Sequence, residues 1–363
     1  MRIITTTGSS GGHIFPAVSF LDKLKEKCPQ AEAILVLPRR SAKNNIIPEG
    51  FKIYYISTQS FGLKPNLKNL SGLFNFFRGS LESLLLLSKF KPDIVVGFGT
   101  IDCIPLVMLA WACRIKTIIH EQNVIPGKAN RFLGKFVDKV AVSFIQTKDY
   151  LKADDKKIIV TGNPLRKGLK KIDNIEALDF FGFRPDKFTI LVMGGSQGSH
   201  QINMAIPEAL KLVSNRYRMQ VIHISGAQDI EFLKVRYQDI GVEVKLFSFL
   251  KEIQYAYSAS DMAICRSGAT TAAELLFFKL PAIIIPYPFA YRHQFANARV
   301  LEEMNAAIVI KEDKLDVGAL AKIIDGLLND PEKIENMHPV YDNAHNFAAD
   351  TLFTDAVLSL VRL

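Results

Sequence analysis

Short apolar segments alternate with amphipathic segments along nearly the whole chain. The apolar segments are only a few residues long and rich in Ile, Val and Leu, which is typical of strands buried on both faces of a parallel sheet. The predicted strands are residues 3–7, 33–37, 53–56, 94–97, 117–120, 139–142 and 158–161, followed by 190–193, 221–224, 244–246, 262–265, 282–285 and 307–310. Residues 17–27 and 80–90 have helical periodicity. This alternation predicts α/β architecture, with helices on both faces of parallel sheets.

The alternation is interrupted once, after Gly162-Asn163-Pro164, where a lysine-rich stretch begins near residues 169–171. A chain of 363 residues exceeds the usual size of one hydrophobic core, so this interruption is a natural domain boundary. We expect two similar α/β domains facing one cleft, residues 1–163 and 164–340. Residues 341–363 are predicted to form a helix that packs back on the first domain.

Two glycine-rich turns each follow a predicted strand and open a helix. They are Gly8-Ser9-Ser10-Gly11-Gly12-His13 and Gly194-Gly195-Ser196-Gln197-Gly198. A strand, a glycine turn and a helix N-terminus together place backbone N–H groups and the positive end of the helix dipole where a phosphate can bind. Ligands of open α/β sheets bind at the carboxyl ends of the strands. The pair of turns therefore predicts a nucleotide-linked substrate.

The first turn lacks the dinucleotide fingerprint, which needs an acidic residue after the second strand, where this chain has Pro38-Arg39-Arg40. An NAD-dependent enzyme is therefore disfavoured. His13 is the sharper feature, because a neutral imidazole at the start of a helix can accept a proton from an attacking hydroxyl. The alternative is a histidine that only caps or packs the helix.

Polar residues also follow the fifth predicted strand, in the run His120-Glu121-Gln122-Asn123. Asn123 can exchange hydrogen bonds with the hydroxyls of a sugar, whereas His120 and Glu121 either serve the site or orient each other beneath it. Position 124 is valine, so the run is not a zinc-binding H-E-x-x-H motif.

A third run, residues 266–274, follows the predicted strand 262–265 and consists of small residues between Arg266 and Glu274. The free N–H groups of Ala269 and Thr270 at a helix start suit a diphosphate. Glu274 lies about one turn further and can accept both hydroxyls of a ribose. The alternative interpretation is that Glu274 lies on a solvated face of the helix, but the neighbouring leucines suggest burial and make this interpretation less favourable.

The loop after the next strand ends in His293 and Gln294, whose polar ends are weaker candidates for sugar contacts. The sequence contains no Asp-x-Asp triplet, so a metal-clamped diphosphate is not supported. We therefore expect no metal and no cofactor, with helix termini supplying the positive charge.

The net charge of +9 favours an anionic partner: a nucleotide, a nucleic acid or an acidic membrane surface. Simple solubility is the alternative, and the absence of any nucleic-acid-binding signature argues against nucleic acid. The four cysteines show no C-x-x-C spacing and are interpreted as reduced residues of a cytosolic protein; they are Cys28, Cys103, Cys113 and Cys265.

Residues 73–87 are rich in leucine and phenylalanine. Basic residues surround them, namely Lys64, Lys68, Arg78, Lys89 and Lys91. Such a stretch either lies in the interface of an anionic bilayer or is a core helix. We expect its leucines to face the sheet and its phenylalanines to face outward. The longest apolar run, 104–113, is too short to span a bilayer and no signal peptide is recognisable, so membrane contact would be peripheral.

Taken in order, these blocks resemble the MurG family. The matching blocks are 8–16, 120–123 with Asn130, 162–166, 194–198, 265–274, and His293-Gln294 with Asn297. The resemblance covers nearly the whole chain and implies the GT-B fold, two Rossmann-like domains facing a cleft. It also implies inverting transfer of N-acetylglucosamine from UDP-N-acetylglucosamine to lipid I, the undecaprenyl-linked muramyl-pentapeptide, giving lipid II. The implied location is the cytoplasmic face of the cell membrane.

The resemblance also implies roles for single residues, with His13 as the general base. Ser10, Gly11 and Gly12 would lie near the diphosphates, and Asn123 near the donor sugar. The remaining donor positions are Arg166 and Ser196 for the diphosphate and nucleotide, Leu250 for uracil through its backbone, Ala269, Thr270 and Thr271 for phosphate, Glu274 for ribose, and His293 and Gln294 for the sugar.

Two departures from the family pattern stand out. Ser10 replaces the usual threonine but keeps a hydroxyl, and residues 97–105 lack the glycine-tyrosine-x-serine pattern of a loop that faces the acceptor. The second departure leaves open another lipid-linked or lipid acceptor, such as diacylglycerol. Two further functions stay open at this point: a UDP-sugar epimerase, and a protein that binds the donor without catalysis.

Overall fold

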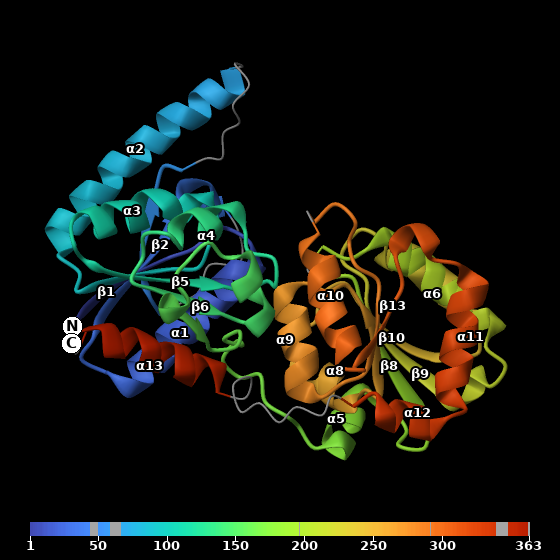
Figure 1. Cartoon of the computed structure of the whole chain (residues 1–363). Helices are drawn as coiled ribbons and strands as arrows, with labels where there is room; N and C mark the ends of the chain where they lie inside the picture. Colours follow the sequence, from blue (N-terminus) through green and yellow to red (C-terminus); the bar gives the residue numbers. More distant parts are fainter. Residues whose placement is uncertain (44–49, 59–66, 196, 291, 339–347, 362–363) are drawn as a thin grey trace. The chain divides into compact units, whose positions relative to one another are not determined.

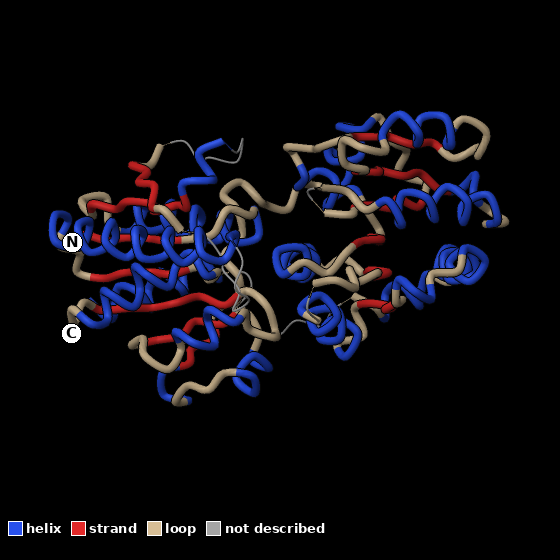
Figure 2. Tube along the Cα trace, turned by 90° about the horizontal axis from the view of Figure 1, so that it is seen from above, coloured by secondary structure: helices blue, strands red, loops and turns tan. Residues whose placement is uncertain are grey.

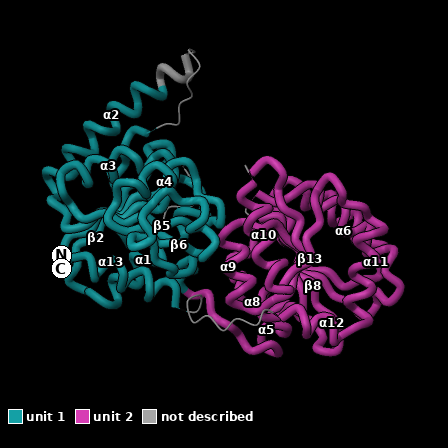
Figure 3. The backbone as a smooth tube through the Cα atoms, viewed as in Figure 1, with its two compact units in different colours: residues 1–167, 344–363 teal, residues 168–343 magenta. Residues whose placement is uncertain are grey.

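The computed structural model describes residues 1–43, 50–58, 67–195, 197–290, 292–338 and 348–361. The chain divides into two compact units, Met1–Lys167 with Ala344–Leu363 and Gly168–Asn343 (Figure 3). We call them the N-terminal and the C-terminal unit. Each contains a parallel sheet covered by helices, which confirms the predicted α/β fold class.

The N-terminal unit is built on a seven-stranded parallel sheet of order β3-β2-β1-β4-β5-β6-β7. Its strands are β1 (Arg2–Thr6), β2 (Glu32–Pro38), β3 (Lys52–Ile56), β4 (Ile94–Gly97), β5 (Lys116–Glu121), β6 (Lys139–Val142) and β7 (Ile158–Val160). Ile4 of β1 pairs with Ile34 and Val95, and all three are fully buried. These strands therefore lie in the middle of the unit, where continuous apolar sequence is required.

The two faces of this sheet are covered by different helices: α1 (Gly11–Lys27), α2 (Leu67–Phe90), α3 (Ile104–Ala112), α4 (Lys128–Leu133) and α13 (Ala349–Val361). Ile3 and Ile94 pack on α1 and α13, whereas their neighbours Ile4 and Val95 pack on α2, α3 and α4. This alternation follows from the two-residue period of a strand. Figures 1 and 2 show the resulting layers.

Helix α13 belongs to the N-terminal unit although it ends the chain (Figure 1). Its Phe353 ring lies edge-on to Phe20, Phe98 and His120, with centroid distances of 5.2, 5.3 and 5.0 Å. Asp355 forms an ion pair with Lys27 of α1 at 2.5 Å. The last helix thus completes the apolar environment of His120.

The expected orientation of α2 is only partly correct. Phe74 and Phe77 are exposed as expected, but leucines are exposed beside them, namely Leu73, Leu81, Leu84 and Leu85. The buried stripe is formed instead by small residues together with one leucine, namely Gly72, Gly79, Ser83 and Leu87. A Cβ at Gly79 would overlap the carbonyl oxygen of Ser57, so α2 approaches the body of the unit too closely for leucines along most of this stripe.

The C-terminal unit has a six-stranded parallel sheet of order β10-β9-β8-β11-β12-β13. Its strands are β8 (Phe188–Met193), β9 (Met219–Ile224), β10 (Glu243–Phe247), β11 (Met262–Cys265), β12 (Ala282–Ile284) and β13 (Ala307–Val309). Its helices are α5 (Asn174–Phe181), α6 (His200–Leu212), α7 (Ile230–Tyr237), α8 (Ile253–Ala259), α9 (Ala269–Phe278), α10 (His293–Glu303), α11 (Val317–Leu328) and α12 (Pro331–Asn336). Helices α6, α7 and α11 share one apolar core, built on alternate residues of β8, β9 and β11.

A buried polar network crosses that core. His223 of β9 is 0% exposed, and its Nδ1 lies 2.7 Å from Tyr237 Oη while its Nε2 lies 3.0 Å from Asn203 Oδ1. The Asn203 amide nitrogen donates to the Ser225 carbonyl and to Asp229 Oδ2. Both nitrogens of the ring are therefore engaged by protein groups.

Candidate functional site

The first glycine turn joins β1 to α1. Ser10 precedes α1 and its side chain makes no capping hydrogen bond, while its carbonyl accepts from the N–H groups of His13 and Ile14 at 3.0 Å each. A Cβ at Gly8 would overlap the side chain of Thr100, so the turns after β1 and β4 pack closely. Ser10 and Gly12 are exposed and Gly11 and His13 are half-buried, so the uncapped helix start is accessible.

His13 is linked through two further side chains to the end of β7. Its Nδ1 lies 3.0 Å from Gln122 Oε1, the Gln122 Nε2 lies 3.2 Å from His120 Nδ1, and His120 Nε2 lies 2.9 Å from the Gly162 carbonyl oxygen. His120 is fully buried, and this burial lowers its pKa to about 4. Gly99 has a φ of +77°, and a Cβ there would contact the His13 ring at 3.6 Å. The backbone after β4 thus lies against this histidine.

Glu121 has different partners from His120. Its Oε1 accepts from the backbone N–H and the side-chain amide of Asn123, at 2.9 and 3.2 Å. Its Oε2 accepts from the Gly127 N–H at 3.0 Å and the Asn130 amide at 2.9 Å. The alternative in which His120 and Glu121 orient each other is therefore not supported, because Glu121 holds the loop that carries Asn123.

Arg166 lies beside the first turn. Its guanidinium carbon is 4.8 Å from the centroid of the Phe15 ring of α1, and the residue is half-buried. The preceding Asn163 is 2% exposed, and neither polar atom of its side chain has a hydrogen-bond partner among the described residues. The block 162–166 thus adds a cation and an amide to the end of β7.

The second glycine turn joins β8 to α6. A Cβ at Gly194 or at Gly198 would overlap backbone atoms, of Ser199 and Ser225 respectively, so both positions require glycine. Ser196 lies outside the described residues. Arg266 is 7% exposed and supports this turn: it donates to Ser199 Oγ at 2.7 Å and to the Ile285 carbonyl at 3.0 Å. It also forms an ion pair with Glu312.

The N-terminus of α9 lies next to the start of α10. Gly268 precedes α9 without a side-chain cap, and the residues that follow it are half-buried, namely Ala269, Thr270 and Thr271. Ser267 Oγ donates to the Gln294 carbonyl at 2.7 Å, and the Asn297 amide donates to the Ser267 carbonyl at 3.1 Å. These bonds hold Gln294 and the half-buried His293 beside the predicted phosphate site.

Glu274 is buried, with 4% of its surface exposed, so the solvated-face alternative is excluded. Its Oε2 accepts from Tyr257 Oη at 2.7 Å, and the Tyr257 ring stacks on Phe278 at 4.8 Å and 13°. Burial, with the nearby Glu274 charge, raises the pKa of the Cys265 thiol to about 12. The buried side chain of Leu250 follows β10.

The described candidates therefore form two groups, each at the carboxyl ends of the strands of its own unit. Ser10, Gly11, Gly12, His13, Asn123 and Arg166 belong to the N-terminal unit, and Leu250, Ala269, Thr270, Thr271, Glu274, His293 and Gln294 to the C-terminal unit. The sequence did not single out Gln122 or Tyr257 as partners of His13 and Glu274. The polar run 120–123 was a signal that could have pointed to Gln122, whereas Tyr257 lies in an ordinary amphipathic helix.

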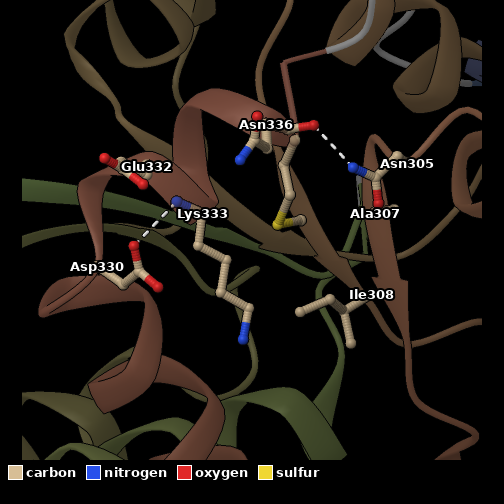
Figure 4. A pocket seen from close by; sticks show the side chains of 8 residues that line it. Asn305, Ala307, Ile308, Asp330, Glu332, Lys333 and Asn336 are labelled. Carbon is tan, nitrogen blue, oxygen red and sulfur yellow. Dashed lines mark hydrogen bonds between the residues drawn. The ribbon is translucent and has the colours of Figure 1, made fainter.

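A pocket of about 310 Å³ opens at the other end of the C-terminal sheet (Figure 4). It is lined by residues at the start of β13 and on α12, among them Asn305, whose amide donates to the Asn336 carbonyl at 2.7 Å. No candidate residue lines it, and amino ends of strands are not where α/β sheets bind ligands. Among the residues that the structure describes, no group of three or more His, Cys, Asp or Glu side chains can hold a metal ion.

Comparison with known proteins identifies the two units. Residues 3–142 match the glycosyltransferase family 28 N-terminal domain, and residues 189–352 match the glycosyltransferase family 28 C-terminal domain. The UDP-N-acetylglucosamine--N-acetylmuramyl-(pentapeptide) pyrophosphoryl-undecaprenol N-acetylglucosamine transferase of Thermoanaerobacter sp. strain X514 is 37% identical, over 96% of both chains. The Desulforamulus reducens enzyme of the same name is 36% identical over 93% of this chain and 92% of its own.

Solved structures have the same fold. MurG of Acinetobacter baumannii aligns with a TM-score of 0.74, at 23% identity over 97% of this chain and 99% of its own. UDP-GlcNAc 2-epimerase of Neisseria meningitidis aligns with a TM-score of 0.69, at 15% identity over 99% of this chain and 100% of its own. Two parallel-sheet units with family 28 domains define a glycosyltransferase of the GT-B fold. Within that class, the identity to full-length relatives shows that the chain belongs to the MurG family.

Proposed function

We propose that this protein transfers N-acetylglucosamine from UDP-N-acetylglucosamine to lipid I with inversion, forming lipid II. The observation that carries the proposal is the match, over nearly the whole chain, to relatives that bear this activity in their name. The geometry of the two candidate groups supports it, because each offers an uncapped helix N-terminus beside groups that suit one part of a nucleotide sugar.

The donor is assigned to the C-terminal unit. The N–H groups at Ala269, Thr270 and Thr271 bind the diphosphate, and Glu274 accepts the ribose hydroxyls while Tyr257 fixes its carboxylate. The Leu250 backbone meets uracil, and His293 and Gln294 contact the sugar. Asn123, Arg166, Ser10, Gly11 and Gly12 contribute from the N-terminal unit, and Ser196, outside the described residues, from the second turn.

In the proposed reaction the acceptor hydroxyl attacks the anomeric carbon of the donor sugar. Its proton passes to His13, and the bond from the anomeric carbon to the diphosphate oxygen breaks, leaving the electron pair on UDP. The helix N-termini and Arg166 stabilise the charge that develops on this leaving group. The scheme uses no metal and no cofactor.

The acceptor is assigned by family, and the loop 97–105 is where the chain departs from the family pattern. That loop is well anchored: Asp102 is 3% exposed, pairs with Arg40 at 2.6 Å and accepts from Thr58 Oγ1 at 2.8 Å. Incubation with labelled UDP-N-acetylglucosamine and lipid I, diacylglycerol or no acceptor tests the assignment. We expect label in lipid II alone. Label in a glycolipid indicates that the enzyme glycosylates diacylglycerol. An isomerised nucleotide sugar in the reaction without acceptor indicates an epimerase.

We further propose that the protein binds an anionic membrane surface peripherally, at the cytoplasmic face. The exposed side of α2 combines large apolar residues with basic ones and comprises Leu73, Phe74, Phe77, Leu81, Leu84 and Leu85 together with Arg78 and Lys89, and the exposed Lys91 directly follows the helix. Such an apolar stripe with a basic rim suits the headgroup region of an anionic bilayer. Lys64 and the side chain of Lys68 lie outside the described part. No described helix is long and apolar enough to cross a membrane.

A further inference from the structure

Three hydrogen bonds in series connect the candidate base to a backbone carbonyl. They run from His13 through Gln122 and His120 to Gly162, with the distances of 3.0, 3.2 and 2.9 Å given above. Two of these groups, the Gly162 carbonyl oxygen and the Gln122 amide oxygen, can only accept. Because each bond needs one donor, the direction of the whole chain can be worked out from the fixed end.

The fixed end is the Gly162 carbonyl, which accepts from His120 Nε2, so the proton of a neutral His120 ring lies on Nε2. His120 Nδ1 then carries a lone pair and accepts from the Gln122 amide nitrogen. The ring is enclosed by Phe98 and Phe353, at centroid distances of 5.6 and 5.0 Å, and the pKa lowered by this burial keeps it neutral near pH 7. Neutral His120 is therefore held in one tautomer.

The orientation of the Gln122 amide has a second, independent support. Its Nε2 also lies 3.3 Å from the His120 carbonyl oxygen, to which only a donor can bond. The flipped amide would place an oxygen against that carbonyl and against the His120 lone pair. The amide oxygen therefore faces His13, and the neutral His13 ring carries its proton on Nδ1.

We propose that Gln122 and His120 are positioning residues that hold neutral His13 with its proton on Nδ1 and the lone pair of Nε2 presented for proton transfer. The inference rests on the proposed function, which assigns His13 as the base. When the acceptor hydroxyl gives up its proton, the new N–H bond forms on Nε2, and the Nδ1–H bond to Gln122 stays in place. The carbonyl dipole of Gln122 then faces the imidazolium and stabilises it.

The direct test observes the tautomer of His13 in the wild-type protein. Two-bond ¹H–¹⁵N spectra of protein labelled at histidine distinguish a protonated from an unprotonated ring nitrogen, and His13→Asn assigns the signal. We expect His13 to carry its proton on Nδ1 at a pH where the ring is neutral. A proton on Nε2 in the wild-type protein overturns the inference.

Two variants then test the relay. Gln122→Met keeps a side chain of similar length without hydrogen bonds, so we expect the His13 signal to shift toward the Nε2–H tautomer and kcat to fall about tenfold or more, with KM for the donor nearly unchanged. Ser143→Ala is the matched control, because the one partner of Ser143 Oγ among the described residues is the backbone carbonyl of Glu121, at 3.2 Å, within the same buried region. It should leave the tautomer and kcat unchanged.

The outcomes separate the two proposals. If Gln122→Met keeps the wild-type tautomer and kcat, the relay has no positioning role. If the tautomer behaves as expected but His13→Asn is fully active, the general-base assignment fails and the relay remains a structural property. If His13→Asn loses activity but His13 of the wild-type protein carries its proton on Nε2, His13 is supported as the general base and the positioning role of Gln122 and His120 is overturned.

Discussion

Lowering the pH should destabilise the C-terminal unit through one histidine, His223. Neither of its ring nitrogens faces water: Nε2 donates to Asn203 Oδ1, so Nδ1 of the neutral ring accepts from Tyr237 Oη. Protonation of Nδ1 would turn the Tyr237 hydroxyl from donor to acceptor, remove the acceptor of its own proton and place a charge in an apolar core. Burial accordingly lowers the pKa of His223 to about 3, and only the nearby Asp229 opposes this shift.

The magnitude follows from linkage between protonation and folding. In the unfolded chain the histidine titrates at its ordinary pKa of 6.5, whereas in the folded chain it stays neutral down to about 3. Stability from this group is therefore complete above pH 6.5 and is lost as the pH falls, at roughly 1.4 kcal/mol for each pH unit. Between pH 7.5 and 5.0 the free energy of unfolding should fall by about 2 kcal/mol from His223 alone.

Urea unfolding at pH 7.5 and 5.0, followed by circular dichroism, measures this loss. His223→Gln retains a donor and an acceptor but does not titrate, so its unfolding free energy should change about 2 kcal/mol less between the two pH values than that of the wild type. Trp111, the single tryptophan, lies in the N-terminal unit, and its fluorescence provides an internal reference that the substitution should leave unchanged. Equal pH dependence of both proteins by circular dichroism would refute the reasoning.

Three further predictions concern the site and the membrane surface. His13→Ala should lower kcat for UDP release about 10²- to 10⁴-fold, since a general base contributes that much; unchanged turnover removes His13 from the mechanism. Glu274→Gln keeps a partner for Tyr257 but loses the charge, so KM for UDP-N-acetylglucosamine should rise about tenfold or more, and an unchanged KM contradicts the ribose assignment. Phe77→Ser with Leu81→Ser should abolish flotation with anionic vesicles while leaving thermal unfolding within a few degrees of the wild type; undiminished flotation places the lipid contact elsewhere.

The strands were the most predictable part of the fold. Each strand predicted from the sequence coincides with a strand of the structure to within two residues at either end. The reason is physical: strands such as β1, β4 and β8 are buried on both faces, so burial requires every residue of the run to be apolar or small.

The orientation of α2 could not be predicted in the same way. Its large apolar residues gather on one side of the helix, and that side is the exposed one, so the usual rule that the apolar side of a helix faces the core gives the wrong orientation. What decides the orientation is the space available beside Ser57, which admits Gly79 and Ser83 but not a leucine. That space depends on residues distant in the sequence.

The same limit applies to the candidate site. Glycine turns and helix starts are local features, and the structure has them where the sequence predicted them. The partners of the candidate residues are not local: Gln122 reaches His13 across 109 positions. His120 and Glu121 are neighbours in sequence but point to opposite faces of β5, as strand geometry requires, and so serve different partners.

The return of α13 to the N-terminal unit has a consequence for biosynthesis. During translation the first sheet leaves the ribosome long before the helix that covers Phe20 and Phe98, because the entire C-terminal unit is made in between. The nascent chain must wait with an uncovered aromatic surface, which is a state prone to aggregation. A premature stop codon near the 3′ end of the coding sequence would therefore damage the half of the protein that was synthesised first.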